Sequence, residues 1–343
     1  MDLETLERRA EIIRRIRSFF VSRHYLELDV PALAPALIPE TCLEVFKTEL
    51  LSPGGGRPAP LYLTPSPEVY IKKIIAAHRV DVFQVSKCYR NCESLGAVHN
   101  PEFTMLEYYT MNAAYKQSAA LTEEFFDYLG VPPALSPPFT RLTMDEAFLR
   151  FAGFRLSEAQ ETGALAEQAR RLGIAEGPEN PFENWAWDDL YELILVHAVE
   201  PALPRERPVV LLDYPAQAVC LAGDVPPKSG PSGAPLWKER WELYADGVEL
   251  ANCYTEETDP DKIRAYFERE GAIKEMTART PHAVDRDYWK IFEDFPPCSG
   301  VALGVDRLIA LMTGSRGIEP VLPFPLSTPY AGTSGCSCPR ESQ

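Results

Sequence analysis

Two glutamates, Glu242 and Glu249, flank a turn in the segment ELYADGVELANCYTEETDP, residues 242–260. The pair Asp246-Gly247 between two alternating runs predicts a two-residue β-hairpin. In that hairpin the two glutamates become diagonal neighbours on one face of the sheet. Two carboxylates at such a short separation repel each other. Mg²⁺ prefers carboxylate oxygens as ligands and usually binds substrate phosphates at the same time. The hairpin therefore predicts a magnesium site beside a bound nucleotide. The expected cross-strand pairs are Ala245 with Val248, Tyr244 with Glu249, and Glu242 with Ala251.

A second polar group lies in NPEFTMLEYY, residues 100–109. Strand alternation puts Phe103, Met105, Glu107 and Tyr109 on one face. A carboxylate and a phenol can together hold an ammonium group, and Phe103, about 13 Å from Glu107 along a strand, could stack on a flat ring. Taken alone, the pattern is equally typical of a core strand with one hydrogen-bonded glutamate.

Two arginines complete a possible nucleotide site. Arg90 ends the preceding strand and enters a loop, and Arg307 in GVDRL precedes an apolar helix. A guanidinium group can grip a phosphate or a carboxylate with two hydrogen bonds, although either arginine alone is more typical of an ordinary surface or ion-paired residue. Together, the arginines, the acids and the aromatic ring predict ATP and Mg²⁺ bound next to an amine-bearing substrate.

The overall charge argues against a broad nucleic-acid surface. The 343 residues carry a net charge of −16, from 50 acids against 34 bases, whereas nucleic-acid binding needs a basic stripe. The basic segments 8–17 and 72–79 are interpreted as solvated helix faces. The sequence has no bilayer-spanning apolar run and no recognisable signal peptide, which predicts a cytoplasmic protein.

The elements predict an α+β fold, with an antiparallel sheet flanked by helices. Residues 1–327 are expected to form one domain. The remaining tail, 328–343, is predicted to be disordered. Helices are expected at 3–24, after the strand at 61–63, over much of 115–205 and at 259–280; strands are expected at 25–36, 81–90, 100–109, 208–216 and in the 242–256 hairpin; a strand running into a helix is expected at 298–314.

Several motifs resemble those of class II aminoacyl-tRNA synthetases. LDVPALAPA is similar to motif 1, YRNCES…HNPEFTMLEYY to motif 2 and GVALGVDRL to motif 3. The segments SPE (66–68), HNPEFT and ELANCYTEETDP resemble the lysine-specific branch. The chain starts at the motif 1 helix, without the anticodon-binding barrel of lysyl-tRNA synthetases. In length, architecture and SGVALGVDRL it resembles the elongation factor P–(R)-β-lysine ligase family, over about residues 5–325.

The resemblance implies an enzyme that activates (R)-β-lysine with ATP and Mg²⁺ and transfers it to a lysine of elongation factor P. It implies a homodimer formed through motif 1, with tRNA and membranes not expected as partners. Arg90 would hold the α-phosphate and Arg307 the γ-phosphate, and both, with Glu249, would be catalytic. The other implied nucleotide-side residues are Glu93 and Phe103 for adenine, His99 near the phosphates, Leu250, Gly304, and Glu242 with Glu249 for Mg²⁺. The implied amino-acid pocket comprises Ser66, Glu68 for one amine, Glu107 with Tyr109 for the other, and Asn100, Asn252, Tyr254, Glu256 and Ala302.

Three features depart from the family pattern. The loop from Arg90 to Asn100 is one residue longer, and Cys92 stands where a glutamate is usual. Strict alternation also puts Asn252 on the face opposite Glu249, so a β-bulge near Ala251 is needed to unite them.

Three other functions fit parts of the sequence. One is a short enzyme that charges tRNA with lysine, and another is an inactive regulatory paralogue that binds an amino acid. The third is an amino-acid ligase similar to asparagine synthetase, whose pocket should suit an acidic side chain. Glu107 and Tyr109 favour an ammonium group instead.

Overall fold

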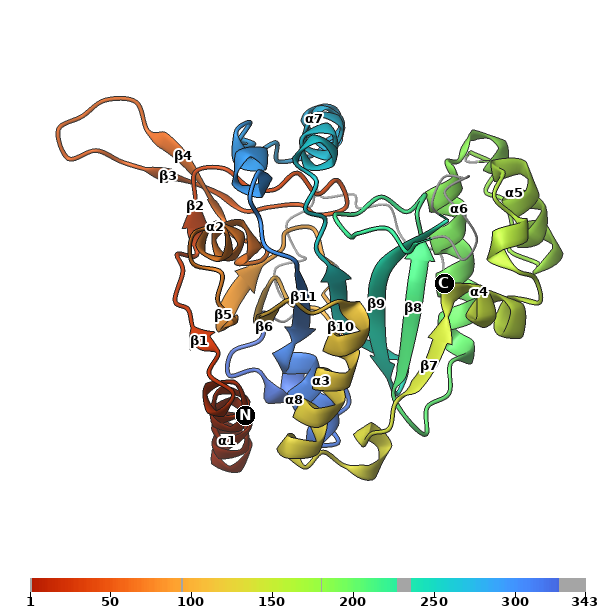
Figure 1. Ribbon diagram of the computed structural model, residues 1–343, viewed down its shortest axis with the longest axis horizontal. Coiled ribbons are helices and arrows are strands. Elements are labelled where there is room, and N and C mark those ends of the chain that lie inside the picture. The colour runs from red at the N-terminus through yellow and green to blue at the C-terminus, as the bar shows by residue number, and fades with distance from the viewer. Residues whose placement is uncertain (1, 94, 180, 227–235, 327–343) are drawn as a thin grey trace.

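An eight-stranded sheet forms the centre of the protein (Figure 1). The computed structural model describes residues 2–93, 95–179, 181–226 and 236–326; the predicted tail, 328–343, lies outside them. The strand order is β1 (Leu26–Glu27), β5 (Val82–Tyr89), β6 (Glu102–Met111), β11 (Cys298–Gly304), β10 (Val248–Thr255), β9 (Trp237–Ala245), β8 (Val209–Pro215) and β7 (Thr140–Thr143).

The predicted antiparallel arrangement is confirmed for the central strands, from β5 to β8. The two outermost pairs, β1 with β5 and β7 with β8, are parallel. The sheet is therefore mixed, and its edges differ from the prediction because a parallel neighbour leaves no hairpin signal in the sequence.

Three helices cover one face of the central strands: α1 (Leu3–Ser22), α3 (Tyr115–Leu129) and α8 (Val305–Met312). Helix α1 buries Ile12, Ile16, Phe19 and Phe20, which lie at helical spacing. They pack in one hydrophobic cluster with Leu106 and other residues of β6 and β11. The neighbours of Leu106 in β6, Met105 and Glu107, therefore face the other side of the sheet.

The opposite face is partly covered by α2 (Glu68–His78), α7 (Pro260–Thr277) and the short helix η7 (Tyr288–Phe292). Figure 1 shows α2 and α7 near the same end of the molecule. Tyr109 of β6 belongs to their hydrophobic cluster, together with Ile71 of α2 and Phe267 of α7. These elements enclose one end of the exposed face, where the candidate site lies.

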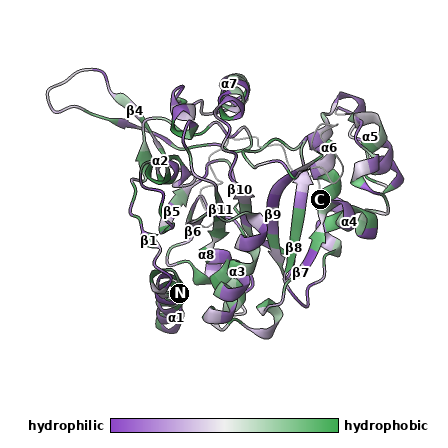
Figure 2. Cartoon of the chain, in the orientation of Figure 1, coloured by the Kyte–Doolittle hydropathy of each residue, from purple (hydrophilic) through white to green (hydrophobic). Residues whose placement is uncertain are grey.

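A helical region packs against the β7–β8–β9 side of the sheet. It contains the helical segments α4 (Met144–Ala147), η2 (Phe148–Ala152), η3 (Leu156–Glu158), α5 (Thr162–Arg171), η4 (Phe182–Asn184), α6 (Trp187–Ile194), η5 (Leu195–Val199) and η6 (Glu200–Ala202). The helical prediction for 115–205 is confirmed in most of its length, and β7 interrupts it. Figure 2 shows the hydrophobic colouring of β8, in agreement with the buried strand predicted at 208–216.

A small separate sheet contains β2 (Leu33–Ala34), β4 (Ala59–Leu63) and β3 (Lys47–Leu50). Its β3–β4 hairpin projects from the body of the protein (Figure 1). The remaining short helices are η1 (Pro133–Leu135) and η8 (Glu319–Val321). No helix of the described ranges has the length and apolar character to cross a bilayer.

The interpretation of both basic segments as solvated helix faces is wrong for one residue in each. Lys72 of α2 is buried and pairs with two carboxylates. Arg9 of α1 is also buried; its guanidinium lies 2.7 Å from the Asp306 carboxylate and donates to Thr104 Oγ1 at 2.9 Å. Helical periodicity could not reveal these residues, because Asp306, which pairs with Arg9, and Glu256, one of the two acids that pair with Lys72, lie far away in the sequence.

Candidate active site

The β9–β10 hairpin forms with an irregularity in the second strand. Asp246 and Gly247 both have positive φ, as the turn type favoured in two-residue hairpins requires. The expected pairs Ala245–Val248 and Tyr244–Glu249 are confirmed. The expected pair of Glu242 with Ala251 is wrong, because the register shifts between Glu249 and Ala251 and brings Asn252 opposite Glu242.

The shift is the β-bulge expected near Ala251, with Leu250 as the extra residue. It reverses the alternation between Glu249 and Asn252. As a result Glu242, Glu249 and Asn252 share the face of the sheet that α1, α3 and α8 leave open.

A row of paired residues crosses the sheet at this level. Glu107 of β6 pairs with Ala302 of β11, Ala302 with Asn252 of β10, and Asn252 with Glu242 of β9. Residues far apart in the sequence therefore project side by side, and Glu107, Ala302 and Asn252 form the floor of the site.

A cavity of about 230 Å³ lies on the nucleotide side of this floor. Arg307 Nε donates to Val98 O at 3.1 Å, and its Nη1 donates to Glu249 O at 2.8 Å. The Arg90 guanidinium lies 5.2 Å from the centre of the Phe103 ring, and its buried Nε has no hydrogen-bond partner among the described residues. This donor is available to a ligand. The predicted nucleotide-side residues that line the cavity are Arg90, Glu93, His99, Phe103, Glu249, Leu250, Gly304 and Arg307.

A smaller cavity of about 90 Å³ adjoins the first. Ser66 Oγ donates to Glu107 Oε1 at 2.5 Å, whereas the buried Glu107 Oε2 has no hydrogen-bond partner within the described ranges. Burial, followed by the nearby Glu68 carboxylate, raises the pKa of Glu107 to about 8. An arriving ammonium group would satisfy this oxygen and favour its ionised form. The predicted amino-acid residues that line the cavity are Ser66, Glu68, Glu107, Tyr109, Asn252, Tyr254, Glu256 and Ala302.

Gly300 permits the close approach of two of these side chains. A Cβ atom at this position would lie 2.4 Å from Tyr109 Cε1 and 2.7 Å from Glu256 Oε1. Any larger residue would displace the phenol or the carboxylate. The glycine therefore shapes the end of the smaller cavity.

The sequence analysis missed the cation that holds this pocket together. Lys72 Nζ pairs with Glu68 Oε1, one helical turn earlier, and lies 2.7 Å from Glu256 Oε2. Burial raises the pKa of Glu256 to about 7 against the opposing effect of Lys72. The four-residue spacing of Glu68 and Lys72 was a signal for the first pair, but nothing local indicated the second.

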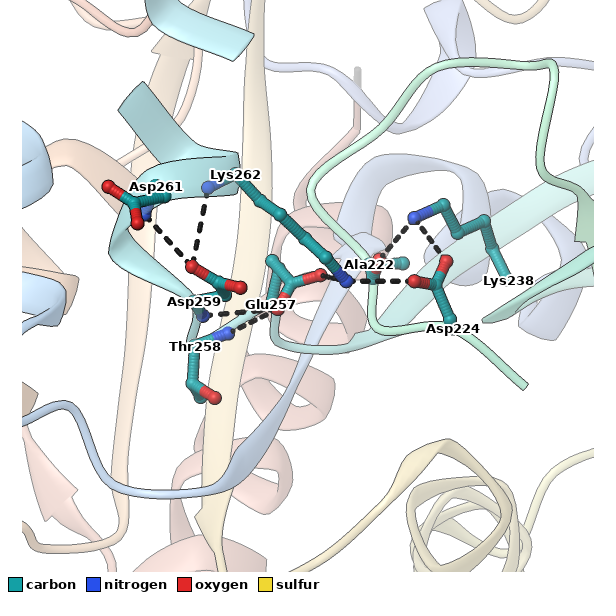
Figure 3. A network of polar contacts seen from close by, with 8 residues as sticks. All are labelled: Ala222, Asp224, Lys238, Glu257, Thr258, Asp259, Asp261 and Lys262. Atoms are coloured by element: carbon teal, nitrogen blue, oxygen red, sulfur yellow. Dashed lines mark hydrogen bonds and ion pairs between the residues drawn. The ribbon is translucent and has the colours of Figure 1, made fainter. Parts of the chain in front are cut away.

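The chain that follows Glu256 is fixed by a polar network (Figure 3). Glu257 accepts hydrogen bonds from the backbone nitrogens of Thr258 and Asp259 and from Lys262 Nζ. Lys262 Nζ also bonds Asp224 at 2.8 Å. The turn from β10 into α7, which begins immediately after Glu256 in the chain, is therefore anchored by Glu257 and Lys262.

Two predicted site residues, Asn100 and Glu242, do not line the cavities to which they were assigned. Asn100 lines the larger cavity and not the smaller one; its Nδ2 donates to Glu102 O and its Oδ1 accepts from Leu326 N. Glu242 lines neither of the two cavities. Its carboxylate accepts from Arg240 Nη2 at 2.5 Å and from Tyr244 Oη at 2.8 Å.

Glu242 nevertheless affects the pKa of Glu249, the other predicted magnesium ligand. Partial removal from water and the neighbouring Glu242 carboxylate raise the pKa of Glu249 to about 7. The described ranges contain no cluster of three or more His, Cys, Asp or Glu side chains that could hold a metal ion alone. Two carboxylates fit a magnesium ion whose other ligands are phosphate oxygens and water.

The two cavities meet at a common wall made by Arg90, Met105, Asn252 and Ala302. A guanidinium group at the junction of a polar cavity and an amine-binding pocket suits the joining of a phosphate and a carboxylate. The geometry thus fits two substrates whose reacting ends meet beside Arg90.

Comparison with known proteins agrees with this arrangement. A family model described as tRNA synthetases class II (D, K and N) matches residues 3–328, so the chain belongs to that family.

Individual relatives narrow the assignment. The chain is 36% identical to the elongation factor P–(R)-β-lysine ligase of Vibrio vulnificus (strain YJ016), over 94% of this chain and 96% of the relative. It is 34% identical to the ligase of the same name from Proteus mirabilis (strain HI4320), over 94% and 95%. The corresponding protein of Hamiltonella defensa subsp. Acyrthosiphon pisum (strain 5AT) is 33% identical, over 94% and 95%. Within the class II group, the chain belongs with these ligases.

Proposed function

We propose that the protein activates (R)-β-lysine with ATP and transfers it to a lysine of elongation factor P. The substrate and the acceptor are those in the name of the relatives, elongation factor P–(R)-β-lysine ligase. The observation that carries the proposal is the meeting of two cavities, one with arginines suited to phosphates and one with carboxylates suited to amines.

The first step would be attack of the substrate carboxylate on the α-phosphorus of ATP. A P–O bond forms, the bond to pyrophosphate breaks, and an aminoacyl adenylate results. Both reactants are anions, so the site has to neutralise and align them. Arg90 would stabilise charge on the α-phosphate from the common wall of the cavities, and Arg307 would bind the leaving group.

The remaining nucleotide-side residues would orient ATP. Phe103 would stack on adenine, while Glu93 would accept from its amino group. Glu249 and Glu242 would together hold Mg²⁺. That ion supplies charge neutralisation on the phosphates.

The second step would be attack of an acceptor amine on the adenylate. The amine nitrogen forms an amide bond to the carbonyl carbon, AMP leaves and the amine loses a proton. No side-chain nucleophile is needed. We further infer that the protein acts as a cytoplasmic homodimer, that neither tRNA nor a membrane is its partner, and that elongation factor P presents the acceptor lysine.

Pyrophosphate exchange with a panel of α- and β-lysine isomers tests the first step. Exchange above background with a lysine isomer is the expected result. Its absence with every isomer would favour a regulatory paralogue that only binds an amino acid, and exchange with an acidic amino acid alone would favour the asparagine-synthetase-like alternative.

The second step is tested by incubation with labelled lysine isomers, elongation factor P and bulk tRNA. We expect label on elongation factor P. Efficient labelling of tRNA alone would overturn the proposed acceptor and favour an enzyme that charges tRNA.

A further inference from the structure

We propose that Lys72 is a positioning residue for the amine pocket, a fixed counter-charge that anchors Glu68 and Glu256 and matches the pocket to a substrate with two ammonium groups. The inference rests on the proposed function, because it concerns the same pocket. It adds a residue that lines neither cavity and that the comparisons do not assign.

Lys72, Glu68 and Glu256 form a largely buried ion triad. The side chains of Lys72 and Glu256 are 1% and 2% exposed, and that of Glu68 is 18% exposed. A buried ammonium group is tolerated only when it is paired, and removal of one partner leaves an uncompensated buried charge. Lys72 and its two acids therefore form one electrostatic unit.

The triad leaves part of each carboxylate for a ligand. Glu256 presents Oε2 to Lys72, while its Oε1 lies next to Gly300, which lines the smaller cavity. Glu68 presents Oε1 to Lys72, and its backbone nitrogen donates to Ser66 Oγ. Ser66 in turn donates to Glu107. Three of the four acids that line the smaller cavity, Glu68, Glu107 and Glu256, are thus connected through Lys72 and Ser66.

The charges in the pocket match a diamine. When ionised, the four carboxylates that line the smaller cavity, Glu40, Glu68, Glu107 and Glu256, carry four negative charges, whereas Arg90 of the same lining and Lys72 carry two positive charges. The difference is two negative charges, which equals the charge of two ammonium groups. Without Lys72, the pocket carries a third negative charge that the two ammonium groups do not neutralise. A pocket whose charge does not match that of its ligand loses selectivity.

Other titratable groups also face Lys72 and contribute to its field. The nearby groups on the surrounding elements are Glu68 on α2, Glu256 after β10, Glu107 on β6, Tyr288 on η7, Cys298 on β11 and Glu40 in the loop after β2. Of these, Glu68 and Glu256 make the direct ion pairs. Loss of the Lys72 charge should therefore favour protonation of Glu256.

The test is Lys72→Met, which keeps the length of the side chain and removes its charge. We expect the KM for the lysine isomer to rise at least tenfold, with the KM for ATP changed less than twofold. The acidic limb of kcat/KM for the amino acid should move to higher pH, because Glu256 loses the cation that favours its ionised form. Calorimetric binding of the amino acid gives a readout that does not depend on turnover.

Lys73→Met is the matched control. Lys73 is the next residue of the same helix, is largely exposed and pairs with Asp285 at 3.1 Å. The variant should match wild type in both KM values and in its pH profile.

The double variant Lys72→Met/Glu256→Gln separates the electrostatic role from a packing role. It removes one charge of each sign and leaves Glu40, Glu68 and Glu107 in the pocket. We expect a loss in kcat/KM smaller than the product of the two single losses, and a folded protein even if Lys72→Met alone fails to fold.

Two outcomes overturn the inference while leaving the proposed function in place. One is wild-type exchange together with a Lys72→Met variant whose amino-acid KM and pH profile are unchanged. The other is a double variant whose loss equals the product of the single losses. Absence of exchange in wild type would instead count against the proposed function itself.

Discussion

Glu107 and Ala302 face each other across the neighbouring antiparallel strands β6 and β11. Glu107 reaches into the smaller cavity, and Ala302 lines both cavities where they meet. The one methyl group of Ala302 therefore lies between the proposed amine-binding carboxylate and the proposed phosphate site. Its size can affect how a substrate carboxylate reaches Arg90.

The first prediction concerns this methyl group. In β-lysine the amine is shifted one carbon from the carboxylate, so a pocket for it can fill the space beside the α-carbon. A change of methylene size is worth about 1–3 kcal/mol. We expect Ala302→Gly to shift the ratio of kcat/KM toward α-lysine by roughly tenfold or more. The measurement is kcat/KM for both isomers in both proteins, and an unchanged ratio would make Ala302 a packing residue.

The second prediction concerns Arg90. Its buried Nε lacks a partner among the described residues, and the side chain lines both cavities. Replacement by alanine should lower pyrophosphate exchange on the order of 10²-fold or more, as expected when one transition-state donor is lost. Arg141→Ala, at an exposed arginine of β7 that pairs with Glu123, should leave exchange unchanged. Near-wild-type exchange in Arg90→Ala would remove this residue from the mechanism.

The third prediction concerns stability and pH. The pKa of Glu107 is raised from 4.5 to about 8, so the folded protein retains a proton that the unfolded chain releases above about pH 5. The stabilising contribution of this proton is greatest at low pH and declines as the pH rises toward 8. Glu107→Gln stays neutral, so its thermal midpoint should exceed that of the wild type increasingly from pH 6 to pH 8.5, by roughly 2–4 °C for each kcal/mol.

The control for this experiment is Glu102→Gln on the same strand. Glu102 is about half exposed and pairs with Lys87 at 3.5 Å. Its substitution should produce no difference that grows with pH. A Glu107→Gln difference that is flat or falls with pH would show that Glu107 is ionised in the empty pocket.

The fourth prediction concerns the proposed homodimer. Exposed apolar side chains occur on α1 and in the following segment, including Leu6, Leu26 and Leu33. If this region is the subunit interface, Leu33→Asp should move sedimentation toward the monomer. Leu149→Asp, at a similarly exposed leucine of η2, should not. A wild-type protein that sediments as a monomer when dilute and is fully active would refute the interface.

Several parts of the fold followed from short-range patterns. The turn at Asp246-Gly247 fixed the first two pairs of its hairpin, because two-residue loops specify register. The alternation of Phe103, Met105, Glu107 and Tyr109 was sufficient to separate the open face of β6 from the face that packs against α1. The parallel edges were not predictable in this way, since they depend on pairing between distant segments.

In the candidate site, too, some features were predicted from the sequence and others were missed. The bulge near Ala251 was expected only because residues with related roles had to share a face, and the register confirms it. The burial of Lys72 and Arg9 was missed, because Asp306, which pairs with Arg9, and Glu256, the second acid that pairs with Lys72, come from other elements. Asn100 was assigned to the amino-acid side by motif, whereas its hydrogen bonds to the chain near Glu102 and Leu326 hold it beside the larger cavity.

The bulge at Leu250 also limits how the length of this chain can change. Loss of Leu250 alone would remove the bulge and leave Asn252 opposite Glu242 in a regular ladder, whereas loss of both Leu250 and Ala251 would move Asn252, Tyr254 and every later residue of β10 to the other side of the strand. A codon lost between β3 and β4, in the projecting hairpin, has no such effect on the site (Figure 1). Insertions and deletions of any length among natural homologues should therefore collect in residues 51–58, whereas 249–252 should tolerate only loss of the bulge residue. A two-residue gap inside that four-residue window marks an error in the alignment or a protein with a different activity.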